Sequence, residues 1–252
     1  MWNYNYFNEL YHYGVKGMKW GVRKDRGYSY KVNNGRLTIK KGSNLHRITA
    51  RPNESNSGYL YAAFTPKDVK HYQKSMTSYL NAVSDSYTTK VYDMSLKVKK
   101  DLVAPSEREK VNTFLELMKD KKVYDEVVKS YENRVIESDH EQFRFATLSN
   151  NLKKSGIPPE ICDCYAAFSM GLYNSEKLRN SFFGKLKDRG FDMVIDTEDK
   201  YIEAEAPIIV FNRDEATKKL SVSELPAKWS EGWYKLREEE KNTKASKLAT
   251  EI

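Results

Sequence analysis

RGFDMVIDTEDKYIEAEAPIIVFN, residues 189–212, is the stretch that decides the fold. It holds two compact apolar runs, FDMVIDT at 191–197 and APIIVFN at 206–212, which are typical of short buried strands. The charged segment between them contains Glu203 and Glu205, which share one face on an extended chain because side chains alternate along it. The stretch therefore predicts two core strands, with a pair of carboxylates leading into the second.

The chain before this stretch reads mainly as helix over residues 67–189. Apolar residues recur there at spacings of three and four, and we place the segment 95–104 in the same helical block. Pro105 breaks the block, and Ser106 with Glu109 forms a capping-box pattern that starts the next helix. A large helical insertion is therefore expected in the middle of the chain.

Residues 27–72, before the helical block, consist of short runs of β-branched and aromatic residues separated by turn signals. Asn34-Gly35 lies between two such runs and predicts a hairpin, because both central positions of that turn need positive φ. Strands, then helices, then strands predict an α+β fold in which the two strand sets meet. The chain divides into a lead-in at 1–26, a domain at 27–225 with its helical insertion at about 67–189, and a charged tail at 226–252.

Composition and simple sequence patterns argue against a membrane-spanning, secreted or metal-binding protein. The chain has 252 residues, 39% hydrophobic and 31% charged, with a net charge of +8 that is spread along its length. No apolar run approaches the roughly 20 residues that span a bilayer, and the N-terminus lacks a secretory pattern. Cys162 and Cys164 are expected to be thiols, with Cys162 half-buried. The histidines are scattered without ligand spacing, so no metal site is expected.

A second informative segment is LYHYGVKGMKWGVRK at residues 10–24, which combines glycine, cations and aromatic residues. It closely resembles the H-x-G-x-K-G-M-K-W-G-V-R tag of tailed-bacteriophage proteins from the head and head-morphogenesis region. The matching residues are His12, Gly14, Lys16, Gly17, Met18, Lys19, Trp20, Gly21, Val22 and Arg23. The resemblance implies a viral origin and association with the phage head or packaging machinery through residues 10–24.

Three positions in or beside strands can carry chemistry. Arg47 lies inside the strand-like run NLHRITA and needs an anionic partner if it is buried. Thr65 ends a strand just before a helix, where it can bind a ligand or cap that helix. Glu205 leads into the strand 206–212, beside Glu203. Each also has an ordinary interpretation, as a surface cation, a helix N-cap and a solvated acidic loop.

Together the three positions are similar to the arginine–serine/threonine–glutamate pattern of the ADP-ribosyltransferase fold, a split β core. The resemblance implies that Arg47 binds the phosphates of NAD, which is the substrate, and that Thr65 supports the nicotinamide ribose. It implies that Glu205 is the catalytic carboxylate and that Glu203 touches the acceptor. The stretch 189–212 also looks like the ending of phage-encoded transferase-like domains. The matching residues there are Gly190, Phe191, Asp192, Asp196, Pro207, Ile209, Val210 and Phe211.

The chain departs from that pattern where the usual Ser-Thr-Ser is Phe64-Thr65-Pro66, and its insertion is long. A second version of the fold uses His, Tyr and Glu, and His46 and Tyr61 could fill those positions. The expected function is a phage-encoded ADP-ribosyltransferase, of the glycosyltransferase class, that modifies a host protein from the virion or in the host cytoplasm. The alternatives are a non-catalytic virion or head-morphogenesis protein that retains the fold and, least favoured, a nucleic-acid-binding accessory protein.

Overall fold

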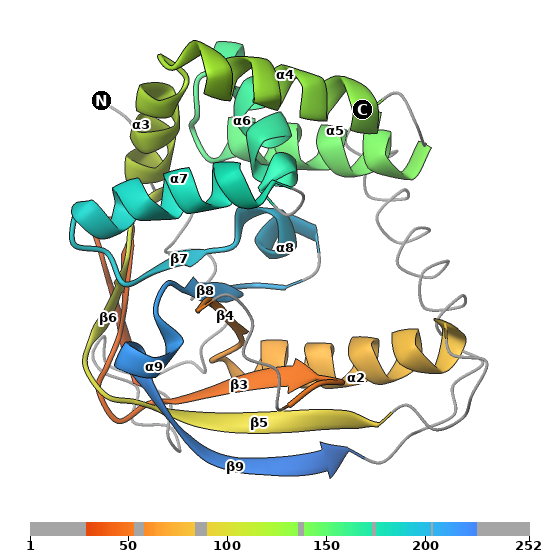
Figure 1. The fold of residues 1–252 in the computed structure, drawn as a ribbon, viewed down its shortest axis with the longest axis vertical. Coiled ribbons are helices and arrows are strands. Elements are labelled where there is room, and N and C mark those ends of the chain that lie inside the picture. Colours follow the sequence, from red (N-terminus) through yellow and green to blue (C-terminus); the bar gives the residue numbers. More distant parts are fainter. Residues whose placement is uncertain are drawn as a thin grey trace, which may run out of the picture.

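The computed structural model describes residues 29–52, 58–83, 90–135, 139–172, 175–202 and 204–225. The segment 10–24, Glu203 and the charged tail lie outside the described residues. Figure 1 shows a layer of helices above a smaller group of strands, with α2 packed along the strands at the opposite end. Helices and antiparallel sheets both contribute, so the α+β class is confirmed.

Nine strands form three antiparallel sheets of three strands each among the described residues, in the orders β1-β2-β6, β3-β5-β9 and β4-β8-β7. The strands are β1 (Tyr30–Asn33), β2 (Arg36–Ile39), β3 (Asn44–Thr49), β4 (Leu60–Ala62), β5 (Val91–Val98), β6 (Leu102–Ala104), β7 (Met193–Ile195), β8 (Ile208–Val210) and β9 (Thr217–Leu225). The helices are α2 (Pro66–Val83), α3 (Glu107–Leu117), α4 (Lys121–Val135), α5 (Asp139–Lys154), α6 (Pro159–Gly171), α7 (Glu176–Asp188), α8 (Thr197–Ile202) and α9 (Arg213–Ala216).

Local signals in the sequence explain several boundaries. The β1–β2 hairpin turns at Asn34 and Gly35, whose φ angles of 49° and 76° are both positive, as the hairpin prediction required. Ser106 and Glu109 form the predicted capping box at the start of α3. Gly190, with φ 84°, follows the end of α7 in the left-handed conformation that commonly terminates a helix.

The prediction that residues 67–189 are mainly helical was wrong between 91 and 104. That segment forms β5 and β6, and β5 pairs with β3 on one edge and β9 on the other. The apolar residues of VYDMSLKV fit a helical period as well as a strand, and short apolar runs do not separate the two. Pairing on both edges decides in favour of a strand, so the helical insertion begins at Glu107.

The sheet β4-β8-β7 lies between two hydrophobic cores. Met193 and Ile208 pack with the β-strands, whereas Val194 and Ile209 pack against the helical layer. A sheet covered on both faces needs apolar residues at consecutive positions, which explains the unbroken runs in the stretch 189–212.

Cys162, in α6, is fully buried, where half-burial was expected.

Candidate functional site

The first half of α2 organises the residues singled out by the sequence. Thr65 is its N-cap, because the Thr65 hydroxyl accepts a hydrogen bond of 3.1 Å from the Asp68 N–H and the Thr65 carbonyl accepts 3.0 Å from Val69. Pro66 follows at the first helical position, where a missing N–H costs nothing. Thr65 therefore has a structural role in addition to any role toward a ligand.

Asp68 connects α2 to the acidic segment before β8. Its carboxylate accepts hydrogen bonds from the Glu205 N–H at 2.9 Å and the Ala206 N–H at 3.0 Å, and the residue is only 1% exposed. These two bonds fix the backbone at Glu205 directly beside the start of α2. The sequence analysis missed Asp68; its signal was an acidic residue three positions after a Thr cap.

Glu205 lies in a bend between α8 and β8, not on the extended segment that was expected to carry Glu203 and Glu205 on one face. Its carboxylate forms an ion pair with Lys67 of α2. The Glu205 side chain is 37% exposed and the Lys67 side chain 72%, so water screens this pair strongly. The carboxylate is held near α2 and remains accessible.

Strand β3 is joined to the end of β4 by two backbone hydrogen bonds of 2.8 Å between His46 and Ala63. Ala63 lies two residues before Thr65. The strand that holds Arg47 therefore reaches the turn at Thr65, and Asp68 continues the connection to Glu205. The backbone segments of the predicted arginine, threonine and glutamate form one hydrogen-bonded unit.

Arg47 is 9% exposed and follows His46 on β3, so the two side chains point to opposite faces of the strand. The buried neighbours of Arg47 on its own face are Leu45 and Thr49. On the other face, His46 contacts Asp93 of β5, with 2.9 Å between Nδ1 and Oδ1. The carboxylate of Asp93 also accepts 2.9 Å from Gln73 of α2, and neither partner was foreseen from the sequence.

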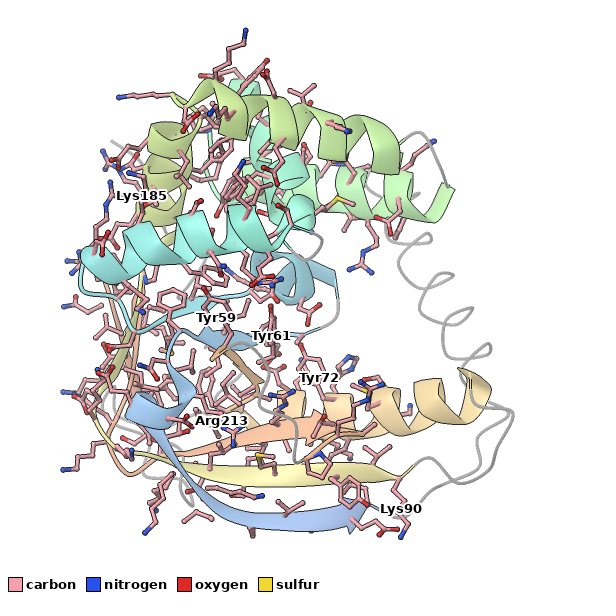
Figure 2. All side chains as sticks on the ribbon, viewed as in Figure 1. Tyr59, Tyr61, Tyr72, Lys90, Lys185 and Arg213 are labelled. Atoms are coloured by element: carbon pink, nitrogen blue, oxygen red, sulfur yellow. The ribbon has the colours of Figure 1, made fainter. Side chains whose placement is uncertain are left out.

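Tyr61 lies apart from this unit, on the face of β4 that the helical layer covers. It is 37% exposed and sits beside Ile209 of β8. Its pKa is raised mainly by burial, although Arg179 opposes the shift. Tyr72 points from α2 toward α8, where its hydroxyl donates 2.8 Å to Asp199 (Figure 2).

A cavity of about 20 Å³ lies between Tyr61 and the helical layer. That volume holds about one water molecule and no nucleotide. Its lining does not include Arg47, Thr65 or Glu205, so it is separate from the unit around α2. The lining residues are Tyr61, Lys110, Tyr165, Ser169, Leu172, Arg179, Phe182, Phe183, Val194, Ile195, Asp196, Thr197 and Ile209.

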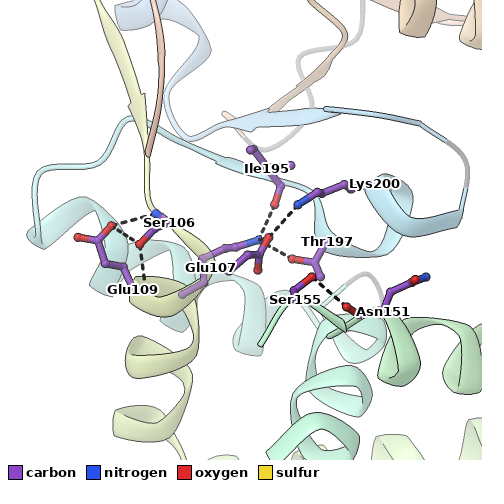
Figure 3. A network of polar contacts seen from close by, with 9 residues as sticks. Ser106, Glu107, Glu109, Asn151, Ser155, Ile195, Thr197 and Lys200 are labelled. Carbon is purple, nitrogen blue, oxygen red and sulfur yellow. Dashed lines mark hydrogen bonds and ion pairs between the residues drawn. The ribbon is translucent and has the colours of Figure 1, made fainter. Parts of the chain in front are cut away.

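Beside the cavity, which Lys110 and Thr197 help to line, is a buried cluster centred on Glu107 and Lys110. Figure 3 shows Glu107 in this cluster with Ile195, Thr197 and Lys200. The Lys110 ammonium donates to Glu107 at 2.8 Å, to the Thr197 hydroxyl at 2.6 Å and to the Ile195 carbonyl at 3.2 Å, so its three donors are all used. Lys200 lies 3.5 Å from the same Glu107 oxygen. These contacts tie α3, β7 and α8 together.

The electrostatics of the cluster follow from burial and pairing. Burial alone would raise the pKa of Glu107, but the ammonium groups of Lys110 and Lys200 outweigh it and hold the pKa below its ordinary value. Burial lowers the pKa of Lys200, against the opposing effect of Glu107. Every donor of Lys110 is engaged within the protein, so we assign the cluster to stability.

Within the described ranges, no group of three or more His, Cys, Asp or Glu side chains is arranged to hold a metal ion. No helix in the described part of the chain is both long and apolar enough to cross a membrane. The two cysteines are free thiols, Cys162 buried and Cys164 exposed.

Residues 5–27 match a family of unknown function, DUF7211. This range includes the tag-like segment 10–24 and covers less than a tenth of the chain. No curated protein and no solved structure shows a significant match.

Proposed function

We propose that the chain is a phage-encoded ADP-ribosyltransferase-like protein that transfers ADP-ribose from NAD to a host protein. The observation that carries the proposal is the hydrogen-bonded unit around α2. His46 bonds to Ala63 and Asp68 bonds to Glu205, so the segments of Arg47, Thr65 and Glu205 are neighbours although they are far apart in sequence. Neighbouring segments of this kind can bring groups to bear on one dinucleotide substrate.

The chemistry of the three side chains suits NAD. A guanidinium such as that of Arg47 binds phosphate through two parallel hydrogen bonds. A carboxylate such as that of Glu205 stabilises positive charge on the ribose while nicotinamide leaves. Thr65 holds the turn between them, and Glu203 is assigned to the acceptor side. In the second version of the site, His46 and Tyr61 take the binding roles.

The test is release of nicotinamide from NAD by the purified full chain, with and without host lysate. Glu205→Gln keeps the size of the side chain and removes its charge, so turnover should fall on the order of a hundredfold while NAD still binds. Arg47→Ala should weaken NAD binding instead, because the cation meets phosphate in both the ground state and the transition state. Equal turnover by wild type and Glu205→Gln would contradict the proposal.

A second candidate is a non-catalytic virion or head-morphogenesis protein that retains the fold. The observation in its favour is that Thr65 and Glu205 each have a structural partner, the N–H of Asp68 and the ammonium of Lys67. In this case wild type cleaves no NAD. Deleting residues 1–24 should then remove the protein from purified virions while the remaining chain keeps its melting temperature.

A further inference from the structure

Strand β9 forms one edge of the sheet β3-β5-β9. Among the described residues it pairs with β5 alone. Figure 1 shows β9 along the lower margin of the molecule, with β5 on its inner side. An edge strand carries backbone N–H and C=O groups that point away from the sheet and can pair with another strand. The outer edge of β9 is therefore a surface to which a further strand can add.

The length of β9 sets it apart from other edge strands of the molecule. β9 has nine residues and is the longest of the described strands, whereas short strands are a common protection for an exposed edge. β1, an edge strand of another sheet, has only four residues. β3, at the opposite edge of the same sheet as β9, exchanges two hydrogen bonds with Ala63 through His46. Within the described ranges, neither form of protection applies to β9.

The side chains of β9 are exposed along most of the strand. Residues 218–224 are all exposed, so the described residues bury neither face of this segment. Leu220 is 52% exposed and Val222 is 36% exposed, and they are two of the five large hydrophobic residues with this degree of exposure in the described part of the chain. Two aliphatic side chains close together on an open edge strand are typical of a surface that contacts a partner.

The charges of β9 discriminate between partners. Lys218 and Lys219 lie near its start, and the register with β5 shifts so that Leu220 is an extra residue between Lys219 and Ser221. Lysines and bulges are devices that oppose pairing of an edge with an arbitrary strand. A suitable partner strand must therefore carry an acidic residue where it meets the two lysines.

A second copy of β9 meets this requirement. Glu224 lies near the end of the strand, so an antiparallel pair centred near Ser221 places the lysines of each copy against Glu224 of the other. Leu220 and Val222 then lie at the centre of the pair. A parallel pair would place lysine against lysine instead. Glu224 already contacts Lys90, but its side chain is 49% exposed and can accept a second ammonium group.

We propose that the outer edge of β9 is the interface of a symmetric dimer, in which the β9 strands of two copies pair in antiparallel orientation. The two three-stranded sheets then form one continuous sheet of six strands. The same surface is used on both copies, so the contact closes and assembly stops at two chains. This inference is independent of the proposed reaction with NAD.

Sedimentation of the full chain over a range of concentrations tests the proposal directly. We expect a reversible dimer with a dissociation constant of about 1–100 µM, because a single pair of strands is a small interface. Open-ended oligomers would contradict a closed contact. A monomer at every concentration would overturn the proposal, and slow hydrogen exchange of β9 amides in that monomer would show that another part of the same chain covers the edge.

The aliphatic centre of the interface is tested with Val222→Lys. A charge at this position should raise the dissociation constant tenfold or more, since lysine opposes pairing at an edge. Leu115→Lys is the matched control, because Leu115 is 39% exposed and lies on α3 in the helical layer. The control should dimerise like wild type, and circular dichroism checks that both variants are folded. Equal dimerisation of the two variants would place the interface elsewhere.

A charge exchange tests the antiparallel orientation without depending on a single variant. Glu224→Lys alone places lysines on both sides of each contact, and Lys218→Glu with Lys219→Glu in one chain places glutamates there. Each of these proteins should dimerise less than wild type, whereas an equimolar mixture should form heterodimers because opposite charges meet again. A mixture that associates no better than its components would contradict the antiparallel pair.

A cysteine at the centre of the strand locates the contact. Ser221→Cys, made together with Cys164→Ser to remove the exposed native thiol, should form disulfide-linked dimers under mild oxidation. Cysteines cross-link readily only when their Cα atoms lie within about 7 Å, as they do at the centre of such a pair. Lys121→Cys on α4, in the same background, is the control. Equal cross-linking of the two variants would overturn the proposal.

Discussion

Two lysine–glutamate pairs in this molecule have the same chemistry and opposite surroundings. Lys110 and Glu107, in the buried cluster, have side chains that are 1% and 2% exposed. Lys67 and Glu205, beside α2, are 72% and 37% exposed. Burial makes a charge costly unless it is paired, so the first pair is committed to the fold. Water screens the second pair, which leaves Glu205 available for chemistry.

The largest effect should come from breaking the buried pair. Lys110→Met leaves Glu107 in the protein interior with Lys200 as its remaining ionic partner, and we expect a loss of about 3–5 kcal/mol in the free energy of unfolding. Urea denaturation followed by far-UV circular dichroism measures this loss. Lys67→Met is the matched control. Similar small losses in the two variants would mean that burial does not separate the two pairs.

A smaller effect is expected at Asp68. Its carboxylate is buried like Glu107, but its partners there are two backbone N–H groups and not an ammonium group. Asp68→Ala leaves the N–H groups of Glu205 and Ala206 without their acceptor, at a cost of roughly 2–4 kcal/mol. Asp68→Asn keeps one acceptor oxygen and should fall between this variant and wild type. Thermal unfolding of the three proteins gives the ranking, and an alanine variant as stable as wild type would show that water replaces the carboxylate.

Substitutions of Thr65 test the contribution of the N-cap of α2, which lies in the region of the exposed Lys67–Glu205 pair. Thr65→Ala removes the acceptor for the Asp68 N–H and should cost about 1 kcal/mol. Thr65→Ser keeps the hydroxyl and should stay within a few tenths of a kcal/mol of wild type. The same two variants are assayed for nicotinamide release. Because serine keeps the hydroxyl, a serine variant that is stable but inactive would point to the lost methyl group and not to the cap.

The smallest effect is expected for the exposed pair itself. Lys67→Ala and Glu205→Gln should each change the free energy of unfolding by less than about 1 kcal/mol, because exposed ion pairs contribute little. A double-mutant cycle on these two residues isolates their coupling. A coupling as large as that in the buried cluster would remove the distinction between the two regions, and it would argue for a structural role of Glu205.

Much of the architecture could be predicted from local signals. The hairpin at Asn34-Gly35 and the capping box at Ser106 depend on residues within a few positions of one another, and both were found where the sequence indicated. The error at 91–104 arose because β5 becomes a strand through partners on two distant strands. The sequence of the short segment itself does not reveal such pairing.

The candidate site likewise contains residues that the sequence could reveal and residues that it could not. Arg47, Thr65 and Glu205 could be named from residue type and position, whereas Asp68 and Asp93 could not. Asp68 acts on a segment that comes much later in the chain, and Asp93 lies in the strand that was mistaken for helix. Residues that hold a site in place work through tertiary contacts, so the sequence pattern reveals them less readily than the residues they support.

The pairing of the strands also sets a constraint on how the protein is made. Leu60 pairs with Val210 and Val91 pairs with Leu225, so two early strands need partners from more than a hundred residues later in the chain. A ribosome delivers those partners after helices α3 to α7, which can pack on one another as soon as they emerge. During synthesis the early strands must wait with open edges until β8 and β9 emerge, and a nascent chain stalled before them would be a candidate for chaperone binding or aggregation.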